Sequence, residues 1–88
     1  MSFEFQLSRQ AASYYRRLDG RTKSRIRERL KEFRRDPYDP HHTRPLTNAA
    51  GRRSARVGGW RIVSSVDDAK RMVNISDIGP RGEIYRGL

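Results

Sequence analysis

The stretch "GRRSARVGGWRIVSSV", residues 51–66, predicts the centre of the fold. Two runs of strand-forming residues flank Gly58-Gly59, and a two-residue glycine turn between such runs is typical of a β-hairpin. Pairing outward from this turn sets Val57 opposite Trp60 and Arg56 opposite Arg61, and paired residues share a face of the sheet. One predicted face is apolar, with Ala55, Val57, Trp60 and Ile62, whereas the other carries Arg52, Ser54, Arg56 and Arg61.

We call the second of these faces the arginine face, and we expect it to be exposed to solvent. Like charges directly opposite each other destabilise a sheet, and Arg56 is expected to lie opposite Arg61. An anion bound between the two guanidinium groups would remove this repulsion. The alternative is a solvated surface on which flexible arginine side chains splay apart, and the hairpin alone leaves both readings open.

Working outward from the hairpin, the chain predicts the order strand, helix, helix and three further strands. Phe3, Phe5 and Leu7 alternate with polar residues, which is typical of a half-buried strand. Ser8 is expected to begin a helix, and the Asp19-Gly20 pair to separate it from a second one. The segment 36–45 holds three of the four prolines and is expected to be a loop. The predicted strands cover residues 2–7, 52–57, 60–66 and 71–78, and the second helix covers roughly residues 21–35.

These elements predict one α+β domain over residues 1–88. Both helices carry an apolar stripe, so we expect them to pack on one face of a mostly antiparallel, four-stranded sheet. The apolar face of the hairpin, including Trp60, is expected to lie against them.

The charge of the chain points to a polyanionic partner. Twenty basic residues against ten acidic ones give a net charge of +10, and lysine accounts for only three of the basic residues. The planar guanidinium of arginine suits phosphate groups, so nucleic acid or an acidic protein is the expected partner. A solubilising surface from an arginine-rich proteome is the alternative that composition alone leaves open.

The sequence offers no candidate metal or cofactor site. Cysteine is absent, and the two histidines, His41 and His42, are neighbours in a proline-rich stretch. We see no apolar run of membrane-spanning length and no signal-peptide pattern, so we expect a cytoplasmic protein without membrane partners.

The residues after the last predicted strand add a second group of candidates. Arg81 follows that strand directly, and Tyr85 follows one short turn later. Neighbouring guanidinium groups favour the ionised form of a tyrosine, which would make Tyr85 a possible proton acceptor. An ordinary tyrosine that anchors the tail through its ring is the alternative.

Over nearly its whole length the chain resembles the RelE/ParE superfamily of toxin–antitoxin toxins. The resemblance rests on the length, the order of elements, the run "SARVGGWRIVSS" (residues 54–65) and the ending "ISDIGPRGEIYR" (residues 75–86). RelE-type members cut messenger RNA in the ribosomal A site, and ParE-type members poison DNA gyrase on the same fold. The resemblance therefore implies a toxin with a cognate antitoxin, and either the ribosome with its message or DNA gyrase as the target.

The resemblance also implies roles for individual residues. Arg61 and Arg81 match arginines that stabilise phosphate charge in the RelE-like nucleases, and Tyr85 matches the tyrosine that helps to activate the ribose 2′-hydroxyl. The residues expected to bind RNA are Arg52, Arg53, Arg56 and Arg86. Two positions depart from the pattern: Ser54 stands where relatives often have a second basic residue, and Pro80 where many have histidine.

Three functions are therefore compared at this stage. The combination of Arg61, Arg81 and Tyr85 favours a metal-independent endoribonuclease that leaves a 2′,3′-cyclic phosphate. A gyrase inhibitor without nuclease activity is the second reading. A non-catalytic RNA-binding module ranks last, because Trp60, the one aromatic residue of the hairpin, is predicted to face the helices rather than stack on bases.

Overall fold

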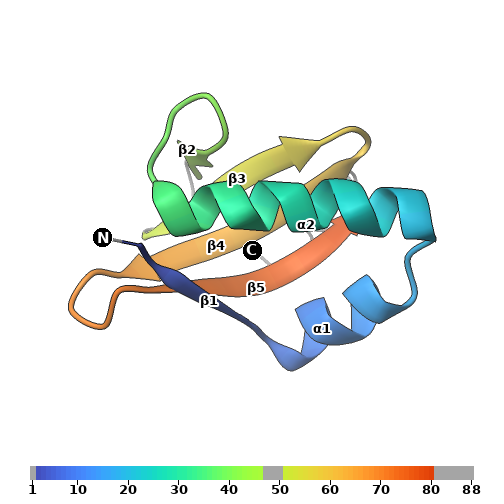
Figure 1. Ribbon diagram of the computed structural model, residues 1–88, viewed down its shortest axis with the longest axis horizontal. Helices are drawn as coiled ribbons and strands as arrows, with labels where there is room; N and C mark the ends of the chain where they lie inside the picture. Colours follow the sequence, from blue (N-terminus) through green and yellow to red (C-terminus); the bar gives the residue numbers. More distant parts are fainter. Residues whose placement is uncertain (1, 47–50, 81–88) are drawn as a thin grey trace.

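The computed structural model describes residues 2–46 and 51–80 of the chain. These residues form two helices and five strands, in agreement with the predicted α+β class (Figure 1). The elements are β1 (Glu4–Leu7), α1 (Arg9–Arg16), α2 (Gly20–Arg35), β2 (Arg44–Pro45), β3 (Arg52–Val57), β4 (Trp60–Asp67) and β5 (Met72–Pro80).

The described strands form one sheet in the order β1-β5-β4-β3-β2, which makes β4 the middle strand. β1 runs parallel to β5, and the other neighbouring pairs are antiparallel. The predicted mostly antiparallel sheet is therefore confirmed.

The predicted number of four strands is wrong, because β2 lies within the segment expected to be a loop. Its two residues pair with β3, Arg44 with Ser54 and Pro45 with Arg53. Two residues are too few for an alternating pattern to show in the sequence. Proline is compatible with this strand because β2 is at the edge of the described sheet.

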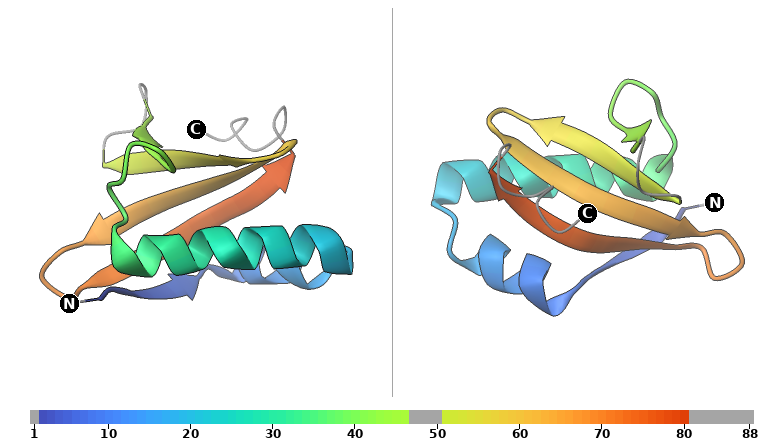
Figure 2. Two further views of the ribbon diagram at one scale, coloured as in Figure 1. Left: turned by 45° about the horizontal axis from the view of Figure 1, so that its top comes forward. Right: turned by 180° about the vertical axis from the view of Figure 1, so that it is seen from behind.

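Both helices lie on the same face of the sheet, as the two views in Figure 2 show. The first helix begins at the predicted residue, where the Ser8 hydroxyl accepts a hydrogen bond from the Ala11 amide at 3.1 Å. The second begins at Gly20, one residue before the predicted Arg21, and Asp19 caps it by accepting a hydrogen bond from the Thr22 amide at 3.3 Å. Hydrogen bonding to Thr22 also lowers the pKa of the Asp19 carboxyl. Within the described residues, neither helix combines the length and apolar character needed to cross a membrane.

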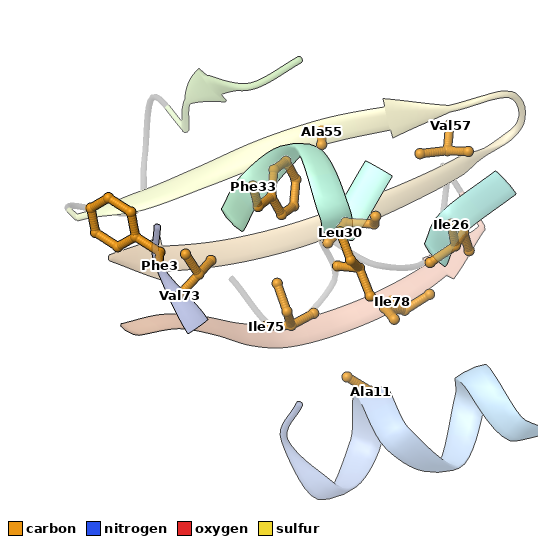
Figure 3. Close-up of a cluster of buried hydrophobic side chains, with 11 residues drawn as sticks. Phe3, Ala11, Ile26, Leu30, Phe33, Ala55, Val57, Val73, Ile75 and Ile78 are labelled. Carbon is orange, nitrogen blue, oxygen red and sulfur yellow. The ribbon is translucent and has the colours of Figure 1, made fainter. Parts of the chain in front are cut away.

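The core lies between the helices and the sheet (Figure 3). Phe33 and Ile26 of α2 are fully buried, and they pack with apolar side chains from β3, β4 and β5. Trp60 is half-buried against this core, and its ring meets Tyr14 of α1 edge to face, with centroids 5.7 Å apart. The predicted orientation of Trp60 toward the helices is therefore confirmed.

The β3–β4 hairpin has the register that the sequence predicts. Val57 pairs with Trp60, and Arg56 pairs with Arg61. Gly58 in the turn has a φ of +62°, a left-handed conformation that glycine adopts without the cost that a side chain imposes.

The pairing of β4 with β5 contains an irregularity beside the arginine face. Val63 pairs with Asp77 and Ser64 with Ile75, so Ser76 has no opposite residue on β4. The Ser76 hydroxyl donates to the Val63 carbonyl at 3.2 Å, and the Ser76 carbonyl accepts from the Ser8 hydroxyl at 2.7 Å. This bulge thereby connects the middle of the sheet to the start of α1, and bulges commonly occur near functional sites.

Candidate functional site

Arg61 occupies the centre of the sheet, on the face that the helices leave uncovered. It lies on the middle strand, and its neighbour Ile62 points into the core on the helix side. Its cross-strand partner on β3 is Arg56, so the predicted pair of facing arginines is present.

The burial of Arg61 differs from the prediction. Only 5% of this residue is exposed, whereas Arg56 is exposed as expected. The expectation of a fully exposed arginine face is therefore wrong at Arg61. Its position explains part of this burial, because β4 is flanked by β3 and β5, whereas Arg56 lies on a strand next to the edge.

The guanidinium of Arg61 has unused hydrogen-bonding capacity. Its Nη1 is buried and has no hydrogen-bond partner, and within the described residues no carboxylate forms an ion pair with it. A buried, unpaired donor on a charged group is costly to stability, since the group loses its water without gaining a partner. This cost makes Arg61 the residue of the sheet for which a functional role needs to be considered.

The other residues of the arginine face differ in polarity and in how far they are exposed. Arg52 is half-buried at the start of β3, and Ser54, two residues on, is 7% exposed. Val63 of β4 is fully buried, and Asp77, its partner on β5, is half-buried. The structure therefore brings Arg52, Arg56 and Arg61 onto one face of the sheet, as predicted.

Arg53, the third predicted RNA-binding residue of the hairpin, contacts the loop before β2 instead of facing this site. Its Nε donates to the Thr43 hydroxyl at 3.0 Å, and its Nη2 donates to the Tyr38 carbonyl at 3.4 Å. Its guanidinium also lies 5.2 Å from the centroid of the Tyr38 ring. These contacts fix the loop between α2 and β2 against β3.

Two further hydrogen bonds shape this loop and shift pKa values. The Tyr38 hydroxyl donates to Asp68 at 2.7 Å, and this bond raises the pKa of Tyr38. Asp39 accepts hydrogen bonds from the backbone amide and the ring of His41, which lower the pKa of Asp39. The loop is therefore held by specific polar contacts along its length.

The remaining predicted site residues, Arg81, Tyr85 and Arg86, lie outside the described residues. Their proposed proximity to Arg61 stays a prediction. No three His, Asp or Glu side chains within residues 2–46 and 51–80 lie close enough together to hold a metal ion.

A first hollow, of about 230 Å³, lies where α2, the loop and β3 meet. We call it the basic hollow, because its lining includes three arginines and two histidines and no acidic residue. The hollow could not be predicted from the sequence, since Arg29 and Arg44 come from elements that only the fold brings to β3. Its lining residues are Arg29, Pro40, His41, His42, Thr43, Arg44, Ser54 and Arg56.

A second hollow, of about 290 Å³, lies between α1 and the turn of the hairpin. We call it the aromatic hollow, since Tyr14 and Trp60 line it together with Arg17 and Leu18. The Arg17 guanidinium lies 5.8 Å from the centroid of the Tyr14 ring. The two hollows thus differ in chemistry, one polar and cationic and the other largely apolar.

The fold of this chain is similar to that of several solved structures, among them complexes of toxins with antitoxins. The RelBE2 toxin–antitoxin complex of Mycobacterium tuberculosis matches with a TM-score of 0.80 and 24% identity, over 92% of this chain and 100% of the other. The RelE–RelB complex of Pyrococcus horikoshii matches with a TM-score of 0.80 and 20% identity, over 94% and 99% of the chains. The YoeB dimer of Staphylococcus aureus matches with a TM-score of 0.71 and 26% identity, over 85% and 92%.

The family comparison identifies the class of the chain directly. The family described as "ParE toxin of type II toxin-antitoxin system, parDE" matches residues 5–85. The chain belongs to this family, and so to the RelE/ParE superfamily of type II toxins. A comparison with curated proteins gives no match.

Proposed function

We propose that this toxin is an endoribonuclease that cuts messenger RNA on the ribosome and is neutralised by a cognate antitoxin. The observation that carries the proposal is Arg61, a residue only 5% exposed whose Nη1 has no hydrogen-bond partner among the described residues, placed opposite the exposed Arg56. Such a pair suits the charge that develops on a phosphate during strand cleavage.

The proposed reaction uses the RNA's own nucleophile. The ribose 2′-oxygen attacks the adjacent phosphorus, the bond from phosphorus to the 5′-oxygen breaks, and a 2′,3′-cyclic phosphate and a 5′-hydroxyl result. Arg61 and Arg81 stabilise the added negative charge. Tyr85 accepts the 2′-hydroxyl proton, and solvent returns a proton to the leaving oxygen. Holding the 2′-oxygen in line with the phosphate supplies much of the acceleration, and no metal ion is required.

The aromatic hollow supports a protein partner for the same chain. An antitoxin segment that inserts an apolar side chain beside Trp60 would bury a surface that water now wets, and an acidic neighbour could pair with Arg17. The Mycobacterium and Pyrococcus relatives were solved as complexes with antitoxins, which agrees with this proposal. Ribosomes and message as targets also imply that the toxin acts in the cytoplasm.

A second function is favoured by the family comparison. The matching family is named for ParE of parDE, and ParE-type toxins of the superfamily poison DNA gyrase. In that case the arginine face would contact gyrase or its DNA without cutting RNA.

A paired assay distinguishes these functions. Purified toxin is mixed with programmed ribosomes under single-turnover conditions, and separately with gyrase and plasmid DNA. We expect cleavage of A-site message and no stabilised gyrase–DNA cleavage complex, with Arg81→Ala slowing cleavage about a hundredfold or more. Tyr85→Phe deletes only the hydroxyl and tests the proton transfer.

The reverse result, gyrase complexes without RNA cleavage, would replace the nuclease with the ParE-like activity. RNA binding with neither activity would favour the non-catalytic module. Cleavage that both variants leave unchanged would keep the function and reject Arg81 and Tyr85 as its residues.

A further inference from the structure

The basic hollow concentrates positive charge from three separate elements. Arg29 comes from α2, Arg44 from β2 and Arg56 from β3, and all three line the same space of about 230 Å³. Arg44 and Arg56 are exposed, and Pro40 is the one apolar residue among the described residues that line the hollow. Like charges gathered in this way repel one another unless an anion lies among them.

Arg29 is held in place within this hollow. Its Nη1 donates to the Arg56 carbonyl at 3.0 Å, which fixes the side chain of a helical residue against the outer edge of β3. Only one of the several N–H donors of a guanidinium is used in this contact. The rest of the group remains available to an anion, and its orientation is already set.

The acidic residues near the hollow lie behind its histidines. His41 pairs with Asp39 at 3.0 Å, and His42 Nε2 lies 3.7 Å from Glu32. Neither carboxylate lines the hollow itself. The surface that a ligand would meet is therefore cationic.

We propose that the basic hollow binds a backbone phosphate of single-stranded RNA, as a second site beside Arg61. The chemistry favours RNA over an acidic peptide, because among the described residues of the lining Pro40 alone offers an apolar surface to a peptide's side chains. A phosphodiester needs only donors and positive charge. The aromatic hollow, in contrast, has the apolar surface that a protein partner requires.

Arg56 links the two sites. It lines the basic hollow and is also the direct cross-strand partner of Arg61. Residues paired in this way have Cβ atoms about 5 Å apart, so one RNA strand can contact both without a break. The assignment of the hollow to RNA beside the scissile phosphate rests on the proposed function, whereas binding of RNA in the hollow is measurable without cleavage.

The test measures binding of a fluorescent 2′-O-methyl RNA oligonucleotide, which cannot be cut because its 2′-oxygen is blocked. Anisotropy titrations across a range of salt concentrations compare the wild type with Arg44→Gln and Arg29→Gln. Arg9→Gln, which removes an exposed arginine of α1, is the matched control for the loss of one charge. Circular dichroism checks that every variant is folded.

We expect each hollow variant to weaken RNA binding about three- to tenfold and to reduce the salt slope by about 0.7 for the lost phosphate contact. Arg9→Gln should leave the slope unchanged. Equal effects of all three variants on RNA binding would show a diffuse charge effect and would overturn the proposal. Unchanged RNA binding in both hollow variants would overturn it as well. A loss of antitoxin affinity with unchanged RNA binding would assign the hollow to protein and also overturn it.

The outcome is separable from that of the proposed function. If the wild type cuts no message but the slope changes as expected, the nuclease fails and the RNA site stands. If it cuts message and the slopes of the hollow variants match those of the control, the nuclease stands and the site is rejected.

Discussion

The two faces of the β3–β4 hairpin differ in how their buried side chains are satisfied, although their residues alternate along the same strands. On the helix side, Ile62 is fully buried in an apolar cluster. On the other side its neighbour Arg61 is almost as buried, yet its Nη1 has no hydrogen-bond partner within residues 2–46 and 51–80. Burial therefore stabilises the fold on one face, whereas on the other it leaves a charged group with an unsatisfied donor, which we propose binds a phosphate.

Together with the proposed function, this contrast assigns folding to one face of the hairpin and chemistry to the other. A period of two residues assigns every second side chain to the core, and the residues between are free to carry charge. Stability and anion binding can then be changed independently by substituting adjacent residues. The predictions below test that independence.

The largest effect is expected for Ile62→Ala. The change leaves a cavity in the core, and we expect the free energy of unfolding to fall by about 2–5 kcal/mol. Urea denaturation followed by circular dichroism measures it. A loss under about 1 kcal/mol would mean that the helix face contributes less than its burial indicates.

The adjacent substitution, Arg61→Met, should reduce RNA cleavage without reducing the stability of the fold. Cleavage of ribosome-bound message is expected to fall about a hundredfold or more, because the preorganised charge is lost. The free energy of unfolding should stay the same or rise by about 1 kcal/mol, since a buried unpaired charge is replaced by an apolar side chain of similar length. A clear loss of stability would show that Arg61 has a structural role and would break the comparison.

A smaller effect is expected from Trp60→Ala on binding of the cognate antitoxin. A half-buried aromatic side chain in an apolar hollow is a typical anchor, so we expect affinity to fall about tenfold or more by calorimetry. Arg44→Gln in the basic hollow is the control and should bind antitoxin nearly as well as the wild type. Equal losses of antitoxin affinity in both variants would mean that the two hollows do not bind different partners, the aromatic one the antitoxin and the basic one RNA.

The smallest effect is expected for Tyr38→Phe, which removes the hydrogen bond to Asp68. Tyr38 is 42% exposed, so we expect a loss of at most about 1 kcal/mol at neutral pH. The pKa of Tyr38 is raised in the folded state, so its contribution is full below the unfolded value near 10 and is lost as pH rises above it. Unfolding at pH 7 and pH 10.5 should show the variant and wild type converging, and a gap that widens with pH would contradict this sign.

The features that the sequence predicts well are those that local rules decide. The glycine turn sets the register of the hairpin, and Ser8 begins the first helix through a hydrogen bond within three residues. The Asp19-Gly20 pair separates the two helices as predicted. The features that it does not predict depend on distant segments. β2 is recognised only through its partner β3, and the Arg29 contact with Arg56 joins residues 27 positions apart.

The candidate site also has features that local rules predict and features that they do not. Alternation alone places Arg56 and Arg61 on one face, and the structure agrees. The burial of Arg61 could not be read from alternation, because a strand pattern shows which face a residue takes but not how well that face is covered. Arg81 and Tyr85 lie outside the described residues, so their part of the site rests on the resemblance.

The parallel pairing of β1 with β5 affects when the toxin can fold during its synthesis. Phe5 pairs with Val73 and Leu7 with Ile75, so contacts between the two strands span 68 residues of chain. The first strand to be synthesised therefore has no partner until nearly the last part of the described chain is made. Contacts of such long sequence separation raise the relative contact order and slow folding, because a large loop must close before they form. The growing chain remains without its completed sheet, and so without the finished arginine face, until synthesis has passed β5.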